Sequence, residues 1–141
     1  MGPTRAEIDH RNLIHNLTLI REAVRPARVM AVVKANAYGH GSIETAQTLI
    51  RNGVDFLAVA FHEEGIQLRC AGIETPVLVF GAQLPGFFND HMSYNLDITL
   101  TGTHQIEYLR ELCRKKGEKA RVHIKVDTGM TRSGSLPRHV P

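Results

Sequence analysis

Short apolar runs alternate with longer amphipathic stretches along most of the chain. Continuous apolar runs are typical of strands buried on both faces, and apolar residues at helical spacing are typical of helices packed on a core. On this basis we predict strands at residues 4–8, 29–33, 56–61, 76–80, 97–100 and 121–126. Helices are predicted at residues 12–24, 42–52, 62–71, 88–94 and 103–116.

Residues with capping chemistry stand at the ends of these predicted helices. Asp9, Ser42 and Thr103 are predicted N-caps, because their side-chain oxygens can accept a hydrogen bond from the first helical turn. Gly53, Gly72 and Gly117 follow predicted helices, where glycine readily adopts the left-handed conformation that ends a helix.

Repeated strand–helix units predict an α/β fold with a parallel sheet. A doubly wound sheet and a (β/α)8 barrel are both compatible with this pattern. The chain has 141 residues, whereas a complete barrel needs roughly 250. After Arg132 the sequence contains two prolines and no periodicity, so no further strand or helix is predicted. We therefore expect the chain to stop in the middle of a domain, with its last strand uncovered.

Composition narrows the classes of function. Hydrophobic residues are 43% of the chain and the formal net charge is only +3, so a buried core is expected and nucleic-acid binding is not. Cys70 and Cys113 form no metal-type pair and lie in predicted helices, which indicates reduced core thiols. No apolar run is long enough to span a membrane, and residues 1–10 lack the apolar core of a signal peptide. We predict a cytoplasmic protein without a membrane partner.

The segment with the clearest chemistry is Ala-Val-Val-Lys-Ala-Asn-Ala-Tyr-Gly-His-Gly, residues 31–41. It places Lys34 at the carboxyl end of a buried strand, the edge at which parallel α/β folds build active sites. Partial burial favours the neutral amine, which can form a Schiff base or abstract a proton. Gly39, Gly41 and the helix start at Ser42 could present N–H groups to a phosphate. The alternative is a lysine that only extends into solvent at a strand end.

Four segments together resemble one family. Residues 32–41 resemble the pyridoxal-phosphate (PLP) attachment motif of the alanine racemase family. Residues 6–17, beginning Ala-Glu-Ile-Asp, resemble its opening strand and helix, and Val59-Ala60-Phe61 before Glu63 and Glu64 resembles a later strand end. Residues 125–132, Lys-Val-Asp-Thr-Gly-Met-Thr-Arg, resemble a fourth segment. These matches occur in the family's order and reach about Gly134.

The resemblance implies a fold and a domain division. Residues 1–134 would be an incomplete PLP-binding barrel domain, a partial (β/α)8 barrel with about five of its eight βα units. Residues 135–141 would be an irregular tail. The later strands and the β-rich second domain of the family would be missing, and with them the tyrosine base from a partner subunit.

The resemblance also assigns roles to individual residues. Lys34 would carry PLP as a Schiff base, and its freed amine would act as the catalytic base on the D-alanine face. Tyr38 would contact the cofactor phosphate through its hydroxyl. Arg132 would lie near the phenolic oxygen of the cofactor and bind the substrate carboxylate, since a guanidinium can grip a carboxylate with two hydrogen bonds.

Lys125 alternates with Val122, Ile124 and Val126 along the last predicted strand, so one of the two sets faces the barrel interior. In the family the lysine at this position points inward and is often carbamylated, which would make it an anion able to orient Arg132. His40 and His123 lack the spacing of metal ligands, and we predict no metal site.

The resemblance predicts an isomerase that interconverts L- and D-alanine with PLP and supplies D-alanine for peptidoglycan and the cell wall. It would be a homodimer in its full-length form, and residues 1–141 alone would be inactive or nearly so. Two alternatives stay open: a racemase of serine or of a broader set of amino acids, and a PLP-binding protein without catalysis.

Overall fold

The computed structural model describes residues 4–139, which form one parallel sheet with helices between its strands. The strands are β1 (Met30–Val32), β2 (Phe56–Val59), β3 (Val77–Val79), β4 (Asp97–Leu100) and β5 (Val122–Ile124). The larger helices are α1 (His10–Ala23), α3 (Ser42–Arg51), α4 (His62–Cys70) and α6 (Thr103–Lys116). The short elements are α2 (Lys34–Tyr38), α5 (Phe88–Ser93), and the 3-10 turns η1 (Pro85–Phe87) and η2 (Pro137–His139).

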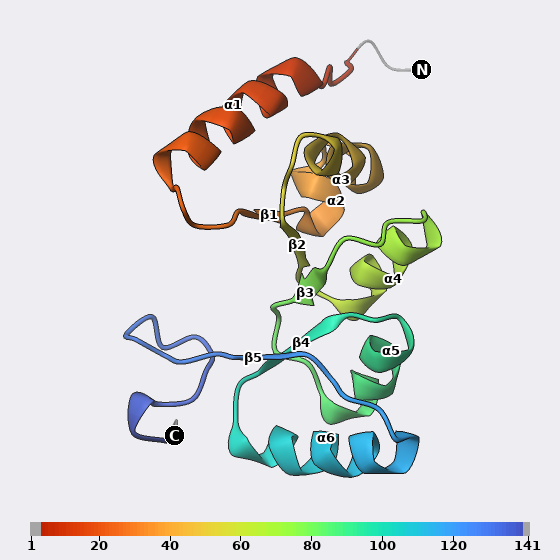
Figure 1. The fold of residues 1–141 in the computed structure, drawn as a ribbon, viewed down its shortest axis with the longest axis vertical. Coiled ribbons are helices and arrows are strands. Elements are labelled where there is room, and N and C mark those ends of the chain that lie inside the picture. The colour runs from red at the N-terminus through yellow and green to blue at the C-terminus, as the bar shows by residue number, and fades with distance from the viewer. Residues whose placement is uncertain (1–3, 140–141) are drawn as a thin grey trace.

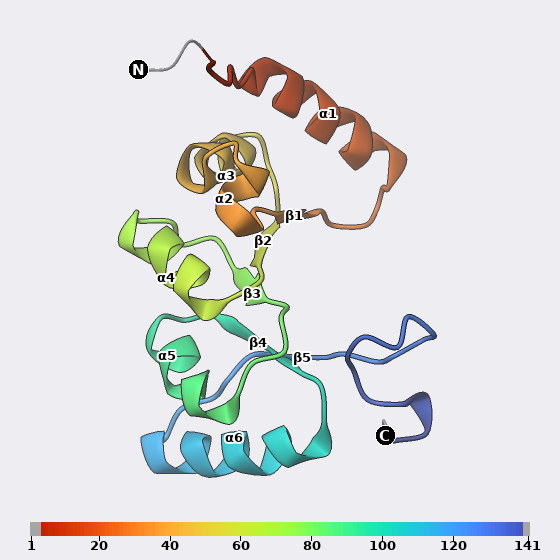
Figure 2. The same cartoon turned by 180° about the vertical axis from the view of Figure 1, so that it is seen from behind.

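The order of the strands decides between the two predicted architectures. All four strand pairs are parallel and the order is β1-β2-β3-β4-β5. A doubly wound sheet reverses its strand order at a switch point, and this sheet does not. Figures 1 and 2 show the strands stacked along the long axis of the molecule, with α1 at one end and α6 at the other. The fold is therefore an arc of a (β/α)8 barrel, as predicted.

One face of the sheet carries the core against the helices. Val59, Val79, Ile98 and Val122 are paired in register across β2, β3, β4 and β5, so their side chains form one row on the same face. Val59 and Val79 pack in a cluster with Leu17, Leu49 and Leu68 of the helices, and Ile98 packs in a second cluster around Phe88 and Leu109. At the end of the row Val122 is 43% exposed.

The opposite face of the sheet is more polar near β5. Leu78 pairs with Asp97, and Thr99 pairs with His123, which places these residues on the face away from the helices. Asp97 is buried and its carboxylate accepts a hydrogen bond from Nε of Arg121 at 2.6 Å. Its second oxygen lies 3.5 Å from Nε2 of His123. These contacts satisfy a carboxylate that would otherwise be costly to bury.

Five of the six predicted strands are confirmed, and the first is wrong. Residues 4–9 form no strand and lead directly into α1. Within residues 4–139 no other strand lies beside this segment, so its peptide groups have no ladder partner and remain exposed to water. All five predicted helices are confirmed, each ending within about three residues of its predicted bounds.

Two of the three predicted N-caps are wrong. The Asp9 side chain caps α1 by accepting from the N–H of Arg11. Ser42 and Thr103 instead lie one residue inside their helices, after Gly41 and Gly102. The capping groups are more distant side chains: Asn36 Oδ1 accepts from Ser42, and Gln105 Oε1 accepts from Thr101 and Gly102.

The structure also bears on the two cysteines, on the segment after Arg132 and on membrane-spanning helices. Cys70 is exposed and Cys113 half-buried, so the prediction of two core thiols is wrong for Cys70, which lies on the outer side of α4. After Arg132 the chain does form regular contacts, a bridge between Val126 and Ser135 and the turn η2. None of the helices within residues 4–139 is long and apolar enough to cross a membrane.

The row across the sheet predicts unequal effects from the same substitution. Val79→Ala removes a side chain that is fully buried and should lower the free energy of unfolding by roughly 2 kcal/mol. Val122→Ala changes an exposed residue of the same row and should cost well under about 1 kcal/mol. Urea unfolding at pH 7 measures both. Equal losses would contradict the assignment of β5 as an uncovered strand.

Candidate functional site

Lys34 lies at the carboxyl end of β1, as the sequence predicted. It follows the fully buried Val33, and its own side chain is half-buried. The Nζ atom is 5.8 Å from the ring centre of Tyr38 and 5.2 Å from that of Phe80, which follows β3. Within residues 4–139 no carboxylate forms an ion pair with Lys34, so the amine is held by aromatic rings alone.

The backbone after Lys34 forms a left-handed turn. Ala35, Asn36, Ala37 and Tyr38 have φ angles of 51°, 54°, 51° and 55°. The left-handed conformation costs an L-residue roughly 1–2 kcal/mol, and such residues usually occur singly. The expected loop relied on Gly39 and Gly41, but the left-handed conformation begins four residues before the first of them. The turn brings the Tyr38 ring back toward the Lys34 amine.

Hydrogen bonds to Asn36 hold this turn closed. Its side-chain Oδ1 accepts from the N–H of Ser42 at 2.8 Å, and its carbonyl accepts from Gly39 and Gly41 at 3.0 Å each. The prediction that Gly39, Gly41 and Ser42 present free N–H groups to a phosphate is therefore wrong. These donors are already used inside the turn, because the left-handed backbone points them toward Asn36.

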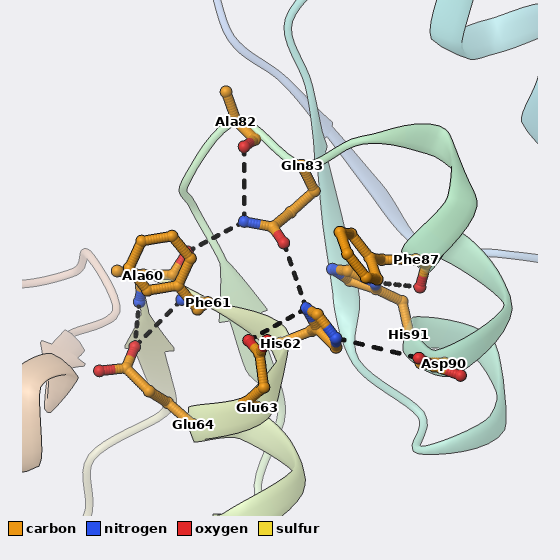
Figure 3. Close-up of polar contacts among 10 residues, drawn as sticks. All are labelled: Ala60, Phe61, His62, Glu63, Glu64, Ala82, Gln83, Phe87, Asp90 and His91. Carbon is orange, nitrogen blue, oxygen red and sulfur yellow. Dashed lines mark hydrogen bonds and ion pairs between the residues drawn. The ribbon is translucent and has the colours of Figure 1, made fainter.

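Glu64 connects the turn to the neighbouring strand. One carboxylate oxygen, Oε1, accepts from the N–H of Ala35 at 2.6 Å. The other, Oε2, accepts from Ala60 at 2.8 Å and from Phe61 at 3.0 Å, just after β2 (Figure 3). A single carboxylate thus joins the loops that follow β1 and β2.

Three further side chains continue this connection across the edge of the sheet. Gln83 donates to the carbonyl of Ala60 at 3.3 Å, as Figure 3 shows, and Gln105 donates to the carbonyl of Gln83 at 2.9 Å. Ser135 donates through its hydroxyl to the carbonyl of Thr101 at 3.1 Å. With Glu64 these side chains form a series, here called the rim series, that links each loop after β1 to β5 with the next.

Arg132 lies in a closed loop after β5. The carboxylate of Asp127 accepts from the N–H groups of Thr131 at 2.9 Å and Gly129 at 3.0 Å, and these bonds lower the pKa of Asp127. Ser135 pairs with the backbone on both sides of Val126, which closes the loop at its base. At Gly134 a Cβ would lie 2.9 Å from the amide nitrogen of Asp127, so the two passes of chain can approach only because this residue is glycine.

The structure does not bring Arg132 to Lys34. Their loops follow β5 and β1, the two edges of the sheet, and within residues 4–139 no hydrogen bond or ion pair joins them. The Arg132 side chain is exposed. The alternation along β5 puts Lys125 on the face of His123 and Thr99, away from the helices, which is the face a closed barrel would enclose.

A pair of buried histidines supports the loop after β2, and sequence patterns did not single it out. His62 approaches Gln83 Oε1 at 3.3 Å through Nδ1, and its ring stacks on Phe87 at 4.4 Å between centres. His91 is fully buried, and its Nδ1 lies 2.8 Å from the carbonyl of Phe87 (Figure 3). Desolvation lowers the pKa of His91, which favours the neutral form of the ring. These contacts pack α4 against η1 and α5.

Of the predicted site residues, the structure thus groups Lys34 with Tyr38, and separately Lys125 with the loop of Arg132. It adds Phe80, Glu64 and the rim series. Glu64 stood in a matched segment, but its contact with Ala35 spans 29 positions and has no local signal. Gln83 and Gln105 are isolated amides in sequence, and only the fold shows that they are buried and paired.

Comparisons of this chain with family models, with relatives in sequence and with solved structures all point to the same family. The model for the alanine racemase N-terminal domain matches residues 8–141, which includes the segment after Gly134. Alanine racemase 2 of Caldanaerobacter subterraneus subsp. tengcongensis is 41% identical over 94% of this chain. The chain spans about a third of that relative's length, 34%.

Solved structures agree with this match. The crystal structure of alanine racemase from E. faecalis superimposes with a TM-score of 0.89 at 34% identity, over 97% of this chain and 38% of that one. The histidine racemase from Leuconostoc mesenteroides subsp. sake superimposes with a TM-score of 0.85 at 30% identity, over 94% of this chain and 37% of that one. The strand-end lysine, the sheet order and these matches together show that the chain belongs to the alanine racemase family, through its N-terminal barrel domain.

Proposed function

We propose that this chain provides the PLP-attachment half of an alanine racemase site, an isomerase that interconverts L- and D-alanine. The observation that carries the proposal is the Lys34 amine at the carboxyl end of β1, free of any ion pair among the described residues and close to the ring centres of both Tyr38 (5.8 Å) and Phe80 (5.2 Å). A half-buried amine without a carboxylate partner among the described residues is available for covalent chemistry. Family membership supports the choice of racemisation over other uses of such a lysine.

The residues around Lys34 suit PLP. The primary amine can join the cofactor's aldehyde, and the flat faces of Tyr38 and Phe80 provide an apolar surface beside it. The exposed Tyr38 side chain can turn its hydroxyl toward a phosphate. PLP, when bound, supplies an electron sink for the pair left at Cα.

This chain's own residues then have distinct tasks. The Lys34 amine moves a proton at Cα on the D-alanine face, and the loop closed by Asp127 and Ser135 presents Arg132 to the substrate carboxylate. Lys125, on the inner face below that loop, would orient Arg132 if carbamylation made it an anion. A second proton donor is needed on the opposite face, and we assign it to a partner subunit in a homodimer.

Substrate choice is the least constrained part of the proposal. A histidine racemase shares this fold with a TM-score of 0.85, so the same framework accepts different side chains, and a broader or serine-directed racemase is the alternative. A PLP-binding protein without catalysis is the second alternative.

We favour alanine as the substrate because the close relatives are alanine racemases. We also propose that the protein acts in the cytoplasm and supplies D-alanine for peptidoglycan.

Covalent attachment of PLP should occur at Lys34. After incubation with PLP and reduction with borohydride, peptide mass mapping should find the label on the peptide that contains Lys34. Lys34→Ala should abolish it, and Lys116→Ala serves as the control because it removes another half-buried lysine, at the end of α6 and outside the proposed site. A label on Lys125, or one spread over surface lysines, would rule out the proposed site.

Arg132→Ala should weaken turnover in a full-length racemase that carries this segment. Loss of a charge-assisted contact to the substrate carboxylate should lower kcat/KM, and the loss of transition-state stabilisation calculated from it should be roughly 2–4 kcal/mol. Steady-state kinetics in both directions measure the effect, with Arg110→Ala on the exposed side of α6 as a control for loss of one positive charge away from the site. An unchanged kcat/KM would show that Arg132 does not contact the substrate.

Residues 1–141 by themselves should not racemise alanine at an enzymatic rate. Lys34 would reach one face of Cα only, and among residues 4–139 the edge strands β1 and β5 have no further strand beside them. D-alanine formed from L-alanine and PLP is compared with a control that contains PLP alone. A rate on the order of 1 s⁻¹ per chain would refute this expectation, because a second base would then have to lie within these residues.

A further inference from the structure

We propose that Glu64 is a positioning residue: its carboxylate holds the left-handed turn after Lys34 against the end of β2 and so directs the Lys34 amine. The inference rests on the proposed function, since it concerns the aim of the same lysine. It assigns a task to a residue that touches neither cofactor nor substrate.

The geometry divides the carboxylate between two loops. Oε1 accepts from Ala35, the residue that follows Lys34 and begins the left-handed turn, at 2.6 Å. Oε2 accepts from Ala60 and Phe61 at the end of β2. The two oxygens therefore set the distance between the loop after β1 and the loop after β2 (Figure 3 shows the second half of this contact).

The turn needs such an acceptor. The N–H of Ala35 has no carbonyl partner among the described residues, because the chain before it is strand β1 and the left-handed backbone turns the amide away from the helix-type pattern. A charged acceptor forms a stronger hydrogen bond than a neutral one. Because Ala35 adjoins Lys34, any relaxation of this bond changes the direction of the lysine side chain.

A purely structural role would look different. Glu64 is in the first turn of α4, and its bonds to Ala60 and Phe61 are ordinary capping bonds. They stabilise α4 without involving the lysine turn. The bond from Oε1 to Ala35 adds nothing to that cap, so capping and positioning are separable.

The neighbouring Glu63 provides a matched control. It lies in the same helical turn with the same carboxylate, but its oxygen contacts His62 at 3.2 Å and not the lysine turn. Glu63→Gln therefore changes the same charge beside the same helix and leaves the Ala35 bond in place.

The test uses Glu64→Gln in the 141-residue chain. An amide has one accepting oxygen, which can serve Ala60 and Phe61 as before, while its NH2 group faces the Ala35 N–H and cannot accept from it. Hydrogen exchange followed residue by residue should show the Ala35 amide exchanging at least about tenfold faster, with α4 unchanged. The amount of PLP reduced onto Lys34 at a fixed subsaturating concentration should fall about tenfold, with urea unfolding nearly unchanged. Glu63→Gln should alter neither.

Two outcomes of these measurements would contradict the positioning role proposed for Glu64. Faster exchange at the start of α4 with the lysine turn unchanged would show that Glu64 is only a helix cap. Equal PLP labelling in the variant and the parent, despite faster exchange at Ala35, would show that the turn does not direct Lys34. If the parent chain itself carries no PLP on Lys34, the proposed function fails, whereas the exchange comparison still decides whether Glu64 holds the turn. Glu64→Asp retains the charge with a shorter reach and should give a smaller loss than Glu64→Gln in both readouts.

Discussion

Parallel pairing of five consecutive strands is the constraint on which the rest of this structure depends. Because β1 to β5 run in one direction and in sequence order, the loop after each strand emerges at the same edge as the loop after its neighbour. Residues far apart in sequence thereby become adjacent. Ala35 and Glu64 are 29 positions apart, and Ser135 and Thr101 are 34 apart, yet each pair is joined by one hydrogen bond.

At this edge of the sheet, a strained backbone segment after Lys34 is held in place by hydrogen bonds from side chains. Four consecutive non-glycine residues after Lys34 adopt a left-handed backbone, a conformation that would not persist in an isolated peptide. Asn36 closes the turn from within, and Glu64 fastens it from the next loop. The lysine thus projects from a rigid corner, which suits an amine that must approach one carbon atom from one side.

The sheet is well packed in its middle and open at its edges. Val79 and Ile98 are fully buried, whereas Val122 of β5 and Val32 of β1 are each more than a third exposed. Apolar strand residues lose contact with water only where a helix or a further strand covers them. The exposure therefore follows the position of each strand in the arc and agrees with relatives in which this segment is about a third of the chain.

Much of this protein was determined by local sequence. The periodicity of residues 10–23 and 103–116 produced helices, the apolar runs produced β1 to β5, and a lysine before a loop of small residues marked the strand end that carries the chemistry. Residues 4–8 show the limit of such patterns: an alternating segment becomes a strand only if another strand lies beside it to accept its hydrogen bonds. Likewise Cys70 follows a helical pattern, but neighbouring elements decided that its side of α4 is exposed.

Only the tertiary structure decided which polar side chains support the site. Sequence order cannot distinguish a barrel arc from a doubly wound sheet, because both arise from the same βα units, and strand neighbours make the choice. Gln83 and Gln105 are isolated amides in sequence, and the matched segment that contains Glu64 gives no local sign of its contact with Ala35. The partners of all three side chains are backbone groups of other loops, which any residue type supplies. Local chemistry placed the reactive amine at the end of β1. The contacts between loops determined where it points, because hydrogen bonds across a sheet form only after its strands have paired.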